Sequence, residues 1–199
     1  ARRMADQSGR TYVSPYNDLD VVAGQGTIAV ELLRQLSERK IGKLDAVFVA
    51  VGGGGLIGGI GSHLQSASPD TELVGCWPEN SPVLYECLRA GKIIEVPEKP
   101  TLSVSTAGGM EPRSVTLEVA RQVIDRSVLV TEREILDAAL RIYREDGQLI
   151  EGAAAVALAA FLKSASDYAG KTVVIVICGG NADPALEATI KERRPASLT

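Results

Sequence analysis

Apolar residues gather in three short runs along the chain, and segments with other patterns separate them. The runs at residues 46–51, 72–77 and 172–178 are rich in Val and other apolar residues and carry almost no charge. A strand of that kind is buried on both faces, which is typical of a parallel sheet covered on both sides. Residues 127–130 predict a further short strand, and residues 11–13 could form another.

Between these runs, apolar residues recur at the spacing of amphipathic helices. In residues 24–40, Ile28, Leu32 and Leu36 fall on one face, and charged residues close the segment. Helix-boundary residues support several of the predicted helices. These are Gly9 as a C-cap, Ser81 with Pro82, Thr131 with Glu134 as a capping box, and Asp183 with Pro184. The other predicted helices are residues 1–8, 56–65, 82–90, 112–126, 131–145, 151–164 and one that begins at 184.

Strands that alternate with helices predict an α/β fold, an open and mostly parallel sheet with helices on both faces. In such sheets, ligands bind beyond the carboxyl ends of the strands. Runs 46–51 and 172–178 are both followed by glycines. We therefore expect the two glycine turns at the same edge of the sheet.

Composition narrows the classes of protein and partner. The chain has 199 residues, a net charge of −4 and no basic cluster beyond residues 191–194, which argues against a nucleic-acid partner. No run reaches the roughly 18 apolar residues of a membrane span, and we expect neither a membrane anchor nor a signal peptide. An odd number of cysteines, Cys76, Cys87 and Cys178, favours reduced thiols and a cytoplasmic location.

Four consecutive glycines, Gly52 to Gly55, follow the run 46–51 and precede a helical pattern. Glycine lets the backbone approach a bound group, and a helix N-terminus directs free N–H groups and a positive dipole end at it. This stretch predicts an anion site, and a phosphate is the expected anion. Two alternatives stay open: a tight turn with no ligand, and a dinucleotide site in which Gly53, Gly55 and Gly58 form a GxGxxG match with Glu79 further on.

Five stretches in order resemble the fold type II pyridoxal-phosphate enzymes, in the threonine/serine dehydratase and serine racemase branch. They are GQGT at residues 24–27, GGGGL at 52–56, AGG at 107–109, IEGAAA at 150–155 and CGGN at 178–181. The resemblance implies pyridoxal 5'-phosphate as cofactor. It also implies elimination of water from a small hydroxyamino acid, which gives a 2-oxoacid and ammonia.

The resemblance also implies site residues. The backbone of Gly52, Gly53, Gly54, Gly55 and Leu56 would hold the cofactor phosphate, in agreement with the glycine pattern. Cys178 would lie beside the pyridine nitrogen, Gly109 against the ring and Glu151 near its far end. Tyr16 would line the substrate side. The plainer alternatives are an inert core thiol for Cys178 and a loop tyrosine for Tyr16.

The chain also departs from the pattern of that family. The segment that carries the Schiff-base lysine does not occur, so no catalytic residue is assigned in this chain. The divalent-metal ligands of some relatives are replaced by Trp77, Ser81 and Val83, so no metal is expected. The sole histidine, His63, has no partner at helical spacing and is interpreted as a bystander.

We therefore expect the C-terminal portion of an enzyme, inactive alone, with residues 1–20 as the end of a small domain and a hinge. Residues 21–199 would be the cofactor-binding large domain without its N-terminal strands. The expected partners are a missing N-terminal segment of the same protein and a second copy in a homodimer. The alternative functions are serine racemase or another hydroxyamino-acid lyase, a noncatalytic binding or assembly module, and a nucleotide-binding dehydrogenase domain.

Overall fold

The computed structural model of the chain describes residues 1–193. The basic residue Arg194 and the end of the expected 21–199 domain lie outside the described residues. Eight α-helices and four strands follow in this order: α1 (Arg2–Ser8), α2 (Leu19–Glu38), β1 (Ala46–Ala50), α3 (Gly55–Ala67), β2 (Glu72–Pro78), α4 (Val83–Ala90), α5 (Thr116–Val123), β3 (Arg126–Val130), α6 (Glu132–Asp146), α7 (Gly152–Ser164), β4 (Val173–Ile175) and α8 (Pro184–Glu192). Two short 3₁₀ helices, η1 (Val104–Thr106) and η2 (Ala165–Tyr168), complete the described elements.

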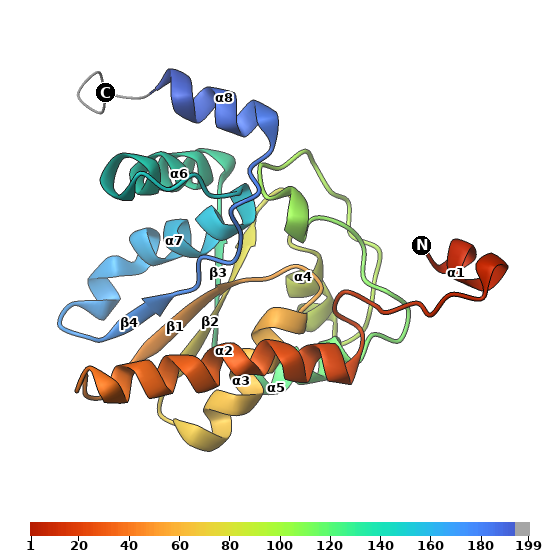
Figure 1. Cartoon of the computed structure of the whole chain (residues 1–199), viewed down its shortest axis with the longest axis horizontal. Coiled ribbons are helices and arrows are strands. Elements are labelled where there is room, and N and C mark those ends of the chain that lie inside the picture. The colour runs from red at the N-terminus through yellow and green to blue at the C-terminus, as the bar shows by residue number, and fades with distance from the viewer. Residues whose placement is uncertain (194–199) are drawn as a thin grey trace.

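The strands form one parallel sheet in the order β3-β2-β1-β4 (Figure 1). In this sheet Ala46 pairs with Glu72 on one side and with Val173 on the other. The expected α/β fold with a parallel sheet is confirmed.

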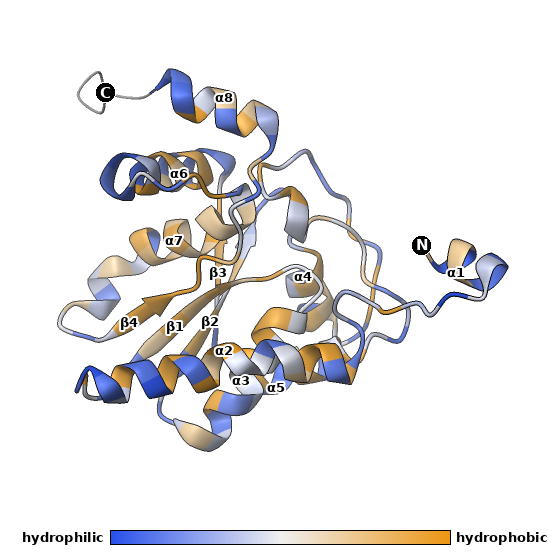
Figure 2. Cartoon of the chain, in the orientation of Figure 1, coloured by the Kyte–Doolittle hydropathy of each residue, from blue (hydrophilic) through white to orange (hydrophobic). Residues whose placement is uncertain are grey.

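Strand β1 explains why the sheet needs cover on both faces. Val47 and Val49 join the core beneath α2, α3, α4 and α5, whereas Phe48 and Ala50 join the core beneath α6 and α7. All four side chains are almost fully buried, and β1 and β4 carry apolar colour in Figure 2. A strand without a polar side is stable only between two such layers.

Several predicted helix boundaries are confirmed in the structure. Gly9 has the left-handed conformation (φ 66°) of a C-cap, Thr131 and Glu134 form a capping box, and Asp183 caps α8 with Pro184 at its first position. No helix among residues 1–193 is both long and apolar enough to cross a membrane. The three cysteines are free thiols.

Other expected elements are wrong or shifted. Residues 11–13 form no strand; Thr11 and Val13 are exposed, and the hydroxyl of Tyr12 donates to Glu111. Ser81 does not cap α4, because its hydroxyl donates to Glu98 and Pro82 takes the N-cap position. Helix α2 begins earlier than predicted, at Leu19, because the side chain of Asp18 accepts hydrogen bonds from two backbone N–H groups.

Two further elements are shorter than their apolar patterns suggest. Residues 112–126 yield a helix only over Thr116–Val123, since the preceding residues turn through Arg113 at φ 59°. Residues 172–178 yield the three-residue strand β4, which is half-buried instead of buried. Among the described residues β4 pairs with β1 alone, so one of its edges has no strand beside it.

Candidate functional site

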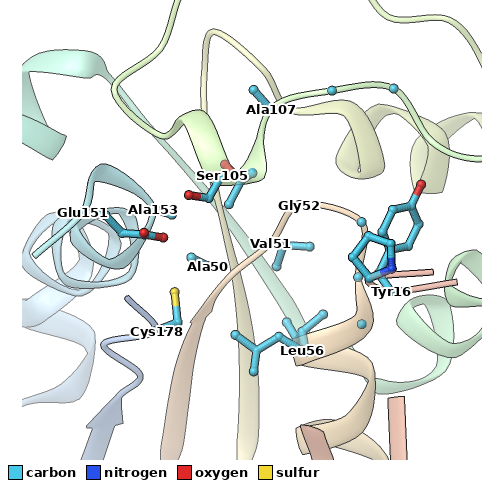
Figure 3. A pocket seen from close by; sticks show the side chains of 18 residues that line it. Tyr16, Ala50, Val51, Gly52, Leu56, Ser105, Ala107, Glu151, Ala153 and Cys178 are labelled. Atoms are coloured by element: carbon cyan, nitrogen blue, oxygen red, sulfur yellow. The ribbon is translucent and has the colours of Figure 1, made fainter. Parts of the chain in front are cut away.

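The site lies where the order of strands in the sheet reverses. The chain passes from β1 outward to β2 and β3 and then returns to the other side of β1 as β4. The connections that leave β1 and β4 therefore diverge beyond their carboxyl ends, which opens a crevice in parallel sheets. A cavity of about 410 Å³ lies there, and Figure 3 shows the side chains that line it.

One wall of the cavity is the turn from β1 into α3. Gly54 has φ 88° and is the N-cap of α3. The first hydrogen bond of the helix runs from the N–H of Gly58 to the carbonyl of Gly54, at 2.9 Å. The N–H groups of Gly55, Leu56 and Ile57 thus have no acceptor within the helix. Such N–H groups, together with the positive end of the helix dipole, attract an anion.

Protein neighbours also require glycine in this turn. A Cβ built on Gly52 would lie 2.9 Å from the Cα of Thr106, and one on Gly53 would lie 2.4 Å from the ring of Tyr16. A Cβ on Gly55 would lie 3.0 Å from the Cα of Tyr16. The glycines therefore let two other segments pack onto the turn, a reason that the sequence pattern did not reveal.

The opposite wall carries Cys178 and Glu151, across the cavity from Tyr16 (Figure 3). The N–H of Glu151 donates to the carbonyl of Gly179 at 3.1 Å, which joins the start of α7 to the segment after β4. Cys178 is exposed to the cavity, while surrounding protein atoms partly desolvate its sulphur. This desolvation, followed by the negative charge of Glu151, raises the pKa of the Cys178 thiol. At neutral pH the thiol is therefore a neutral donor.

A loop at residues 105–109 closes a third side of the cavity. Gly108 has φ 123°, and its N–H donates to the carboxylate of Glu98 at 2.9 Å. Because the same oxygen of Glu98 accepts from the hydroxyl of Ser81, one carboxylate ties the loop to the turn after β2. The loop is thus fixed by a side chain that does not itself line the cavity.

The cavity brings together every residue predicted for the site. These are Tyr16, Gly52, Gly53, Gly54, Gly55, Leu56, Gly109, Glu151 and Cys178. His63 and Trp77 are absent from the lining, and Trp77 is buried in the core. The lining contains no lysine, and residues 1–193 hold no cluster of side chains suited to a metal ion.

Sequence reasoning missed several residues of the cavity wall. Pro15, Ser105, Thr106 and Ala153 also line the cavity. Ser105 and Thr106 directly precede the AGG stretch, in a long connection without periodic pattern, and that position was the one available signal. Nothing in the sequence marks Glu98, whose partners lie 10 and 17 residues away.

The position of Glu79 argues against the dinucleotide interpretation of the glycine turn. In the dinucleotide interpretation this carboxylate would serve the ligand of the glycine turn. In the structure it lies 3.7 Å from Lys163 and is not part of the cavity lining. The carboxylate that this interpretation assigned to the ligand is therefore not part of the cavity.

Comparison with known proteins agrees with this geometry. The sequence profile of the family "Pyridoxal-phosphate dependent enzyme" matches residues 1–179. L-threonine ammonia-lyase of Thermotoga maritima is 39% identical over 183 residues, which are 92% of this chain and 44% of that protein. The chain thus spans a little under half the length of the curated relatives it matches.

Solved structures give the same picture. The processed form of threonine deaminase isoform 2 from Solanum lycopersicum superposes with a TM-score of 0.86 at 28% identity, over 96% of this chain and 55% of that one. Serine racemase from Dictyostelium discoideum superposes with a TM-score of 0.78 at 31% identity, over 92% of this chain and 57% of that one.

Proposed function

Since this chain belongs to the family of pyridoxal-phosphate dependent enzymes, we propose that it forms the cofactor-binding part of a threonine/serine dehydratase-like lyase. Such an enzyme removes water from a hydroxyamino acid and yields a 2-oxoacid and ammonia. One observation carries the proposal: the free N–H groups at the start of α3 and the thiol of Cys178 line the same cavity.

The residues present fit pyridoxal 5'-phosphate. The cavity of about 410 Å³ has the size of a small-molecule site. Its glycine turn offers an anion the N–H groups of Gly55, Leu56 and Ile57. An added Cβ at Gly109 would meet no atom within 4 Å, which leaves room for a planar ring beside that loop. When bound, the cofactor supplies an electron sink for the carbanion at the substrate Cα.

We assign the residues of this chain binding and positioning roles. The backbone of Gly52 to Leu56 would hold the phosphate, and the protonated thiol of Cys178 would be the hydrogen-bond donor for the pyridine nitrogen. A neutral donor leaves that nitrogen unprotonated, which suits elimination. Gly109 would lie along the ring and Glu151 near its far end, while Tyr16, which also lines the cavity, would exclude water on the substrate side.

The amine that attaches the cofactor is assigned to a segment outside these 199 residues. Among the described residues no lysine lines the cavity, and the chain spans 44% of the length of L-threonine ammonia-lyase of Thermotoga maritima. Strand β4 has one edge that no strand of residues 1–193 covers, and this edge, with the exposed side chain of Ile177 beside it, offers the segment a strand to pair with. In this arrangement residues 1–20 end a small domain and form a hinge, and residues 21–199 belong to the large domain.

We extend the proposal to the setting of the whole protein. A homodimer follows from the resemblance to the family, and size-exclusion chromatography with light scattering tests it. A cytoplasmic location is supported by three cysteines that are all free thiols. Both statements concern the protein that contains this chain.

Titration of the purified chain with pyridoxal 5'-phosphate tests the proposed function. We expect reversible binding, followed by absorbance or calorimetry, and no covalent product after borohydride reduction. A chromophore fixed by borohydride would overturn the assignment of the lysine to another segment. Binding of NAD without binding of pyridoxal 5'-phosphate would favour the dehydrogenase domain instead.

Serine racemase activity is the second candidate, and the solved racemase at 31% identity favours it. The two reactions are distinguished in the longer protein by its products from L-serine. Release of a 2-oxoacid with ammonia supports the lyase, whereas accumulation of D-serine supports the racemase. An intact protein that binds the cofactor but forms neither product would favour the noncatalytic module.

A further inference from the structure

One carboxylate outside the cavity collects most of the polar groups of the N-terminal segment. The Oε1 atom of Glu111 accepts from the hydroxyls of Tyr12 at 3.2 Å and Ser14 at 3.0 Å. Its Oε2 atom accepts from the amide of Asn17 at 2.9 Å and from the guanidinium of Arg2. Hydrogen bonds to an ionised acceptor are stronger than neutral ones.

The backbone around Glu111 holds the same segment. The N–H of Glu111 donates to the hydroxyl of Tyr16 at 2.7 Å, and the N–H of Val115 donates to Asn17 at 2.9 Å. Within the segment, the N–H of Asn17 donates to the hydroxyl of Ser14 at 3.0 Å. Residues 12–17 contain no helix or strand, so these bonds determine their position.

Tyr16 connects this network with the site. Its ring lies against Gly53 and its Cα against Gly55, and it lines the cavity across from Cys178 (Figure 3). If residues 12–17 left Glu111, this wall of the cavity would leave with them. The position of Tyr16 thus depends on a residue that is 95 positions away and does not line the cavity.

The burial and the charge of Glu111 suit it to hold the N-terminal segment. Its side chain is 18% exposed, although it lies in a loop, because the N-terminal segment covers it. Partial burial raises its pKa, but the hydrogen bonds from Asn17, Ser14 and Tyr12 and the charge of Arg2 lower it more. The group therefore stays ionised at neutral pH and offers a full negative charge to its donors.

We infer that Glu111 is a positioning residue that fixes Tyr16 as a wall of the cavity. The inference rests on the proposed function for the identity of the ligand, but the docking of residues 12–17 by Glu111 does not. Glu111 does not line the cavity, and it acts through Tyr16.

A double-mutant cycle in cofactor affinity tests this inference. We expect Glu111→Ala to weaken reversible binding of pyridoxal 5'-phosphate by about tenfold, and Tyr16→Ala to weaken it by a similar factor. In the Tyr16→Ala background, Glu111→Ala should cause no further loss. Losses that multiply, or unchanged affinity in Glu111→Ala, would overturn the inference. The matched control is Glu118→Ala, which removes only an exposed ion pair with Arg121.

Proteolysis gives a second measurement that does not involve the cofactor. We expect chymotrypsin to cleave Glu111→Ala after Tyr12 or Tyr16 about tenfold faster than the wild-type chain, because the segment opens more often. Equal rates would overturn the docking role. A wild-type chain that does not bind pyridoxal 5'-phosphate would instead refute the proposed function, and the proteolysis result would still decide the role of Glu111.

Two milder variants keep the test valid if Glu111→Ala fails to fold. Glu111→Gln keeps the Oε1 acceptor for Tyr12 and Ser14 and should fall between wild type and Ala in both measurements. Tyr16→Phe removes only the hydroxyl that accepts from the N–H of Glu111. Fluorescence of the buried Trp77 reports whether each variant retains its core.

Discussion

The ring of Tyr16 lies so close to Gly53 that an added Cβ on Gly53 would be 2.4 Å from the ring carbon Cγ. Only glycine, which has no Cβ, fits beneath this ring without movement of the ring. The N-terminal segment and the glycine turn are therefore one packed unit, although 37 positions separate the two residues.

The first prediction follows from this contact. Gly53→Ala should displace Tyr16 and lower the free energy of unfolding by about 1–3 kcal/mol, as overpacked sites do. Urea denaturation measures the change. The control is Gly24→Ala in the exposed part of α2, where an added Cβ meets no atom within 4 Å. It should stabilise the chain by about 0.5–1 kcal/mol through helix propensity. A destabilised control, or an unaffected Gly53→Ala, would contradict the packing described.

Replacement of Gly54 should remove the anion site. Gly54→Val puts a β-branched residue at φ 88°, with its Cβ 2.7 Å from Leu84, which strains the N-cap of α3. We expect loss of binding of pyridoxal 5'-phosphate and destabilisation of about 2 kcal/mol or more. Gly9→Val carries the same kind of strain at φ 66°, far from the cavity, and should bind normally. Unchanged affinity in Gly54→Val would remove the phosphate assignment.

Glu98 should control the loop at residues 105–109. Glu98→Ala removes the acceptor of the Gly108 N–H and of the Ser81 hydroxyl. We expect faster hydrogen exchange at the Gly108 amide and weaker binding of pyridoxal 5'-phosphate, each by about tenfold. Glu95→Ala, an exposed carboxylate three residues earlier, should leave both values unchanged. Unaltered exchange at Gly108 would show that the loop is fixed by other contacts.

The reactivity of Cys178 should depend on Glu151. Desolvation and the charge of Glu151 both raise the pKa of the thiol, so Glu151→Gln should lower it towards its usual range without reaching it. Alkylation by iodoacetamide as a function of pH measures this, because only the thiolate reacts. At a fixed alkaline pH below the thiol pKa, the variant should react faster than wild type. Cys76 and Cys87 are buried and should stay unreactive in both chains. An unchanged pH profile would show that the charge of Glu151 does not affect the pKa of Cys178.

The capping box of α6 should make the free energy of unfolding depend on pH in the acidic range. Burial raises the pKa of Glu134, but hydrogen bonds from Thr131 and Lys163 lower it more, so it is lower in the folded chain than in the unfolded chain. The contribution of Glu134 is therefore present above the unfolded pKa, and it is lost as pH falls through the folded pKa. Glu134→Gln should destabilise the chain at pH 7 and approach wild-type stability in strong acid. A constant difference across that range in urea denaturation would contradict the ionised capping box.

The sheet could be predicted because the apolar composition of its central strands reflects the burial of their side chains on both faces. Val47 and Phe48 point to opposite faces of β1 and both are buried, so an apolar run without alternation predicted cover on both sides. The helix boundaries at Gly9, Thr131 and Asp183 could be predicted as well, since each depends on residues within one helical turn.

Long-range polar contacts could not be predicted in this way. Ser81 has the sequence context of a helix cap, but its hydroxyl is bound to Glu98, and no local pattern reveals that partner. Glu111 lies in a stretch without periodicity, and its five partners gather only once the chain has folded. The strand β4 was predicted, but its shorter length was not, because the length of a strand depends on its neighbours as well as on its own residues.

The pairing of β1 with β4 has a consequence for how this chain can diverge. Main-chain hydrogen bonds, such as the one from the N–H of Val176 to the carbonyl of Phe48 at 3.0 Å, fix the spacing between the glycine turn and the cysteine. Every amino acid except proline has the same backbone N–H and C=O groups, so other substitutions along these strands preserve that spacing as long as the strands stay paired. Lineages that share this architecture can therefore exchange the side chains that select a substrate while the spacing between the glycine turn and the cysteine stays the same.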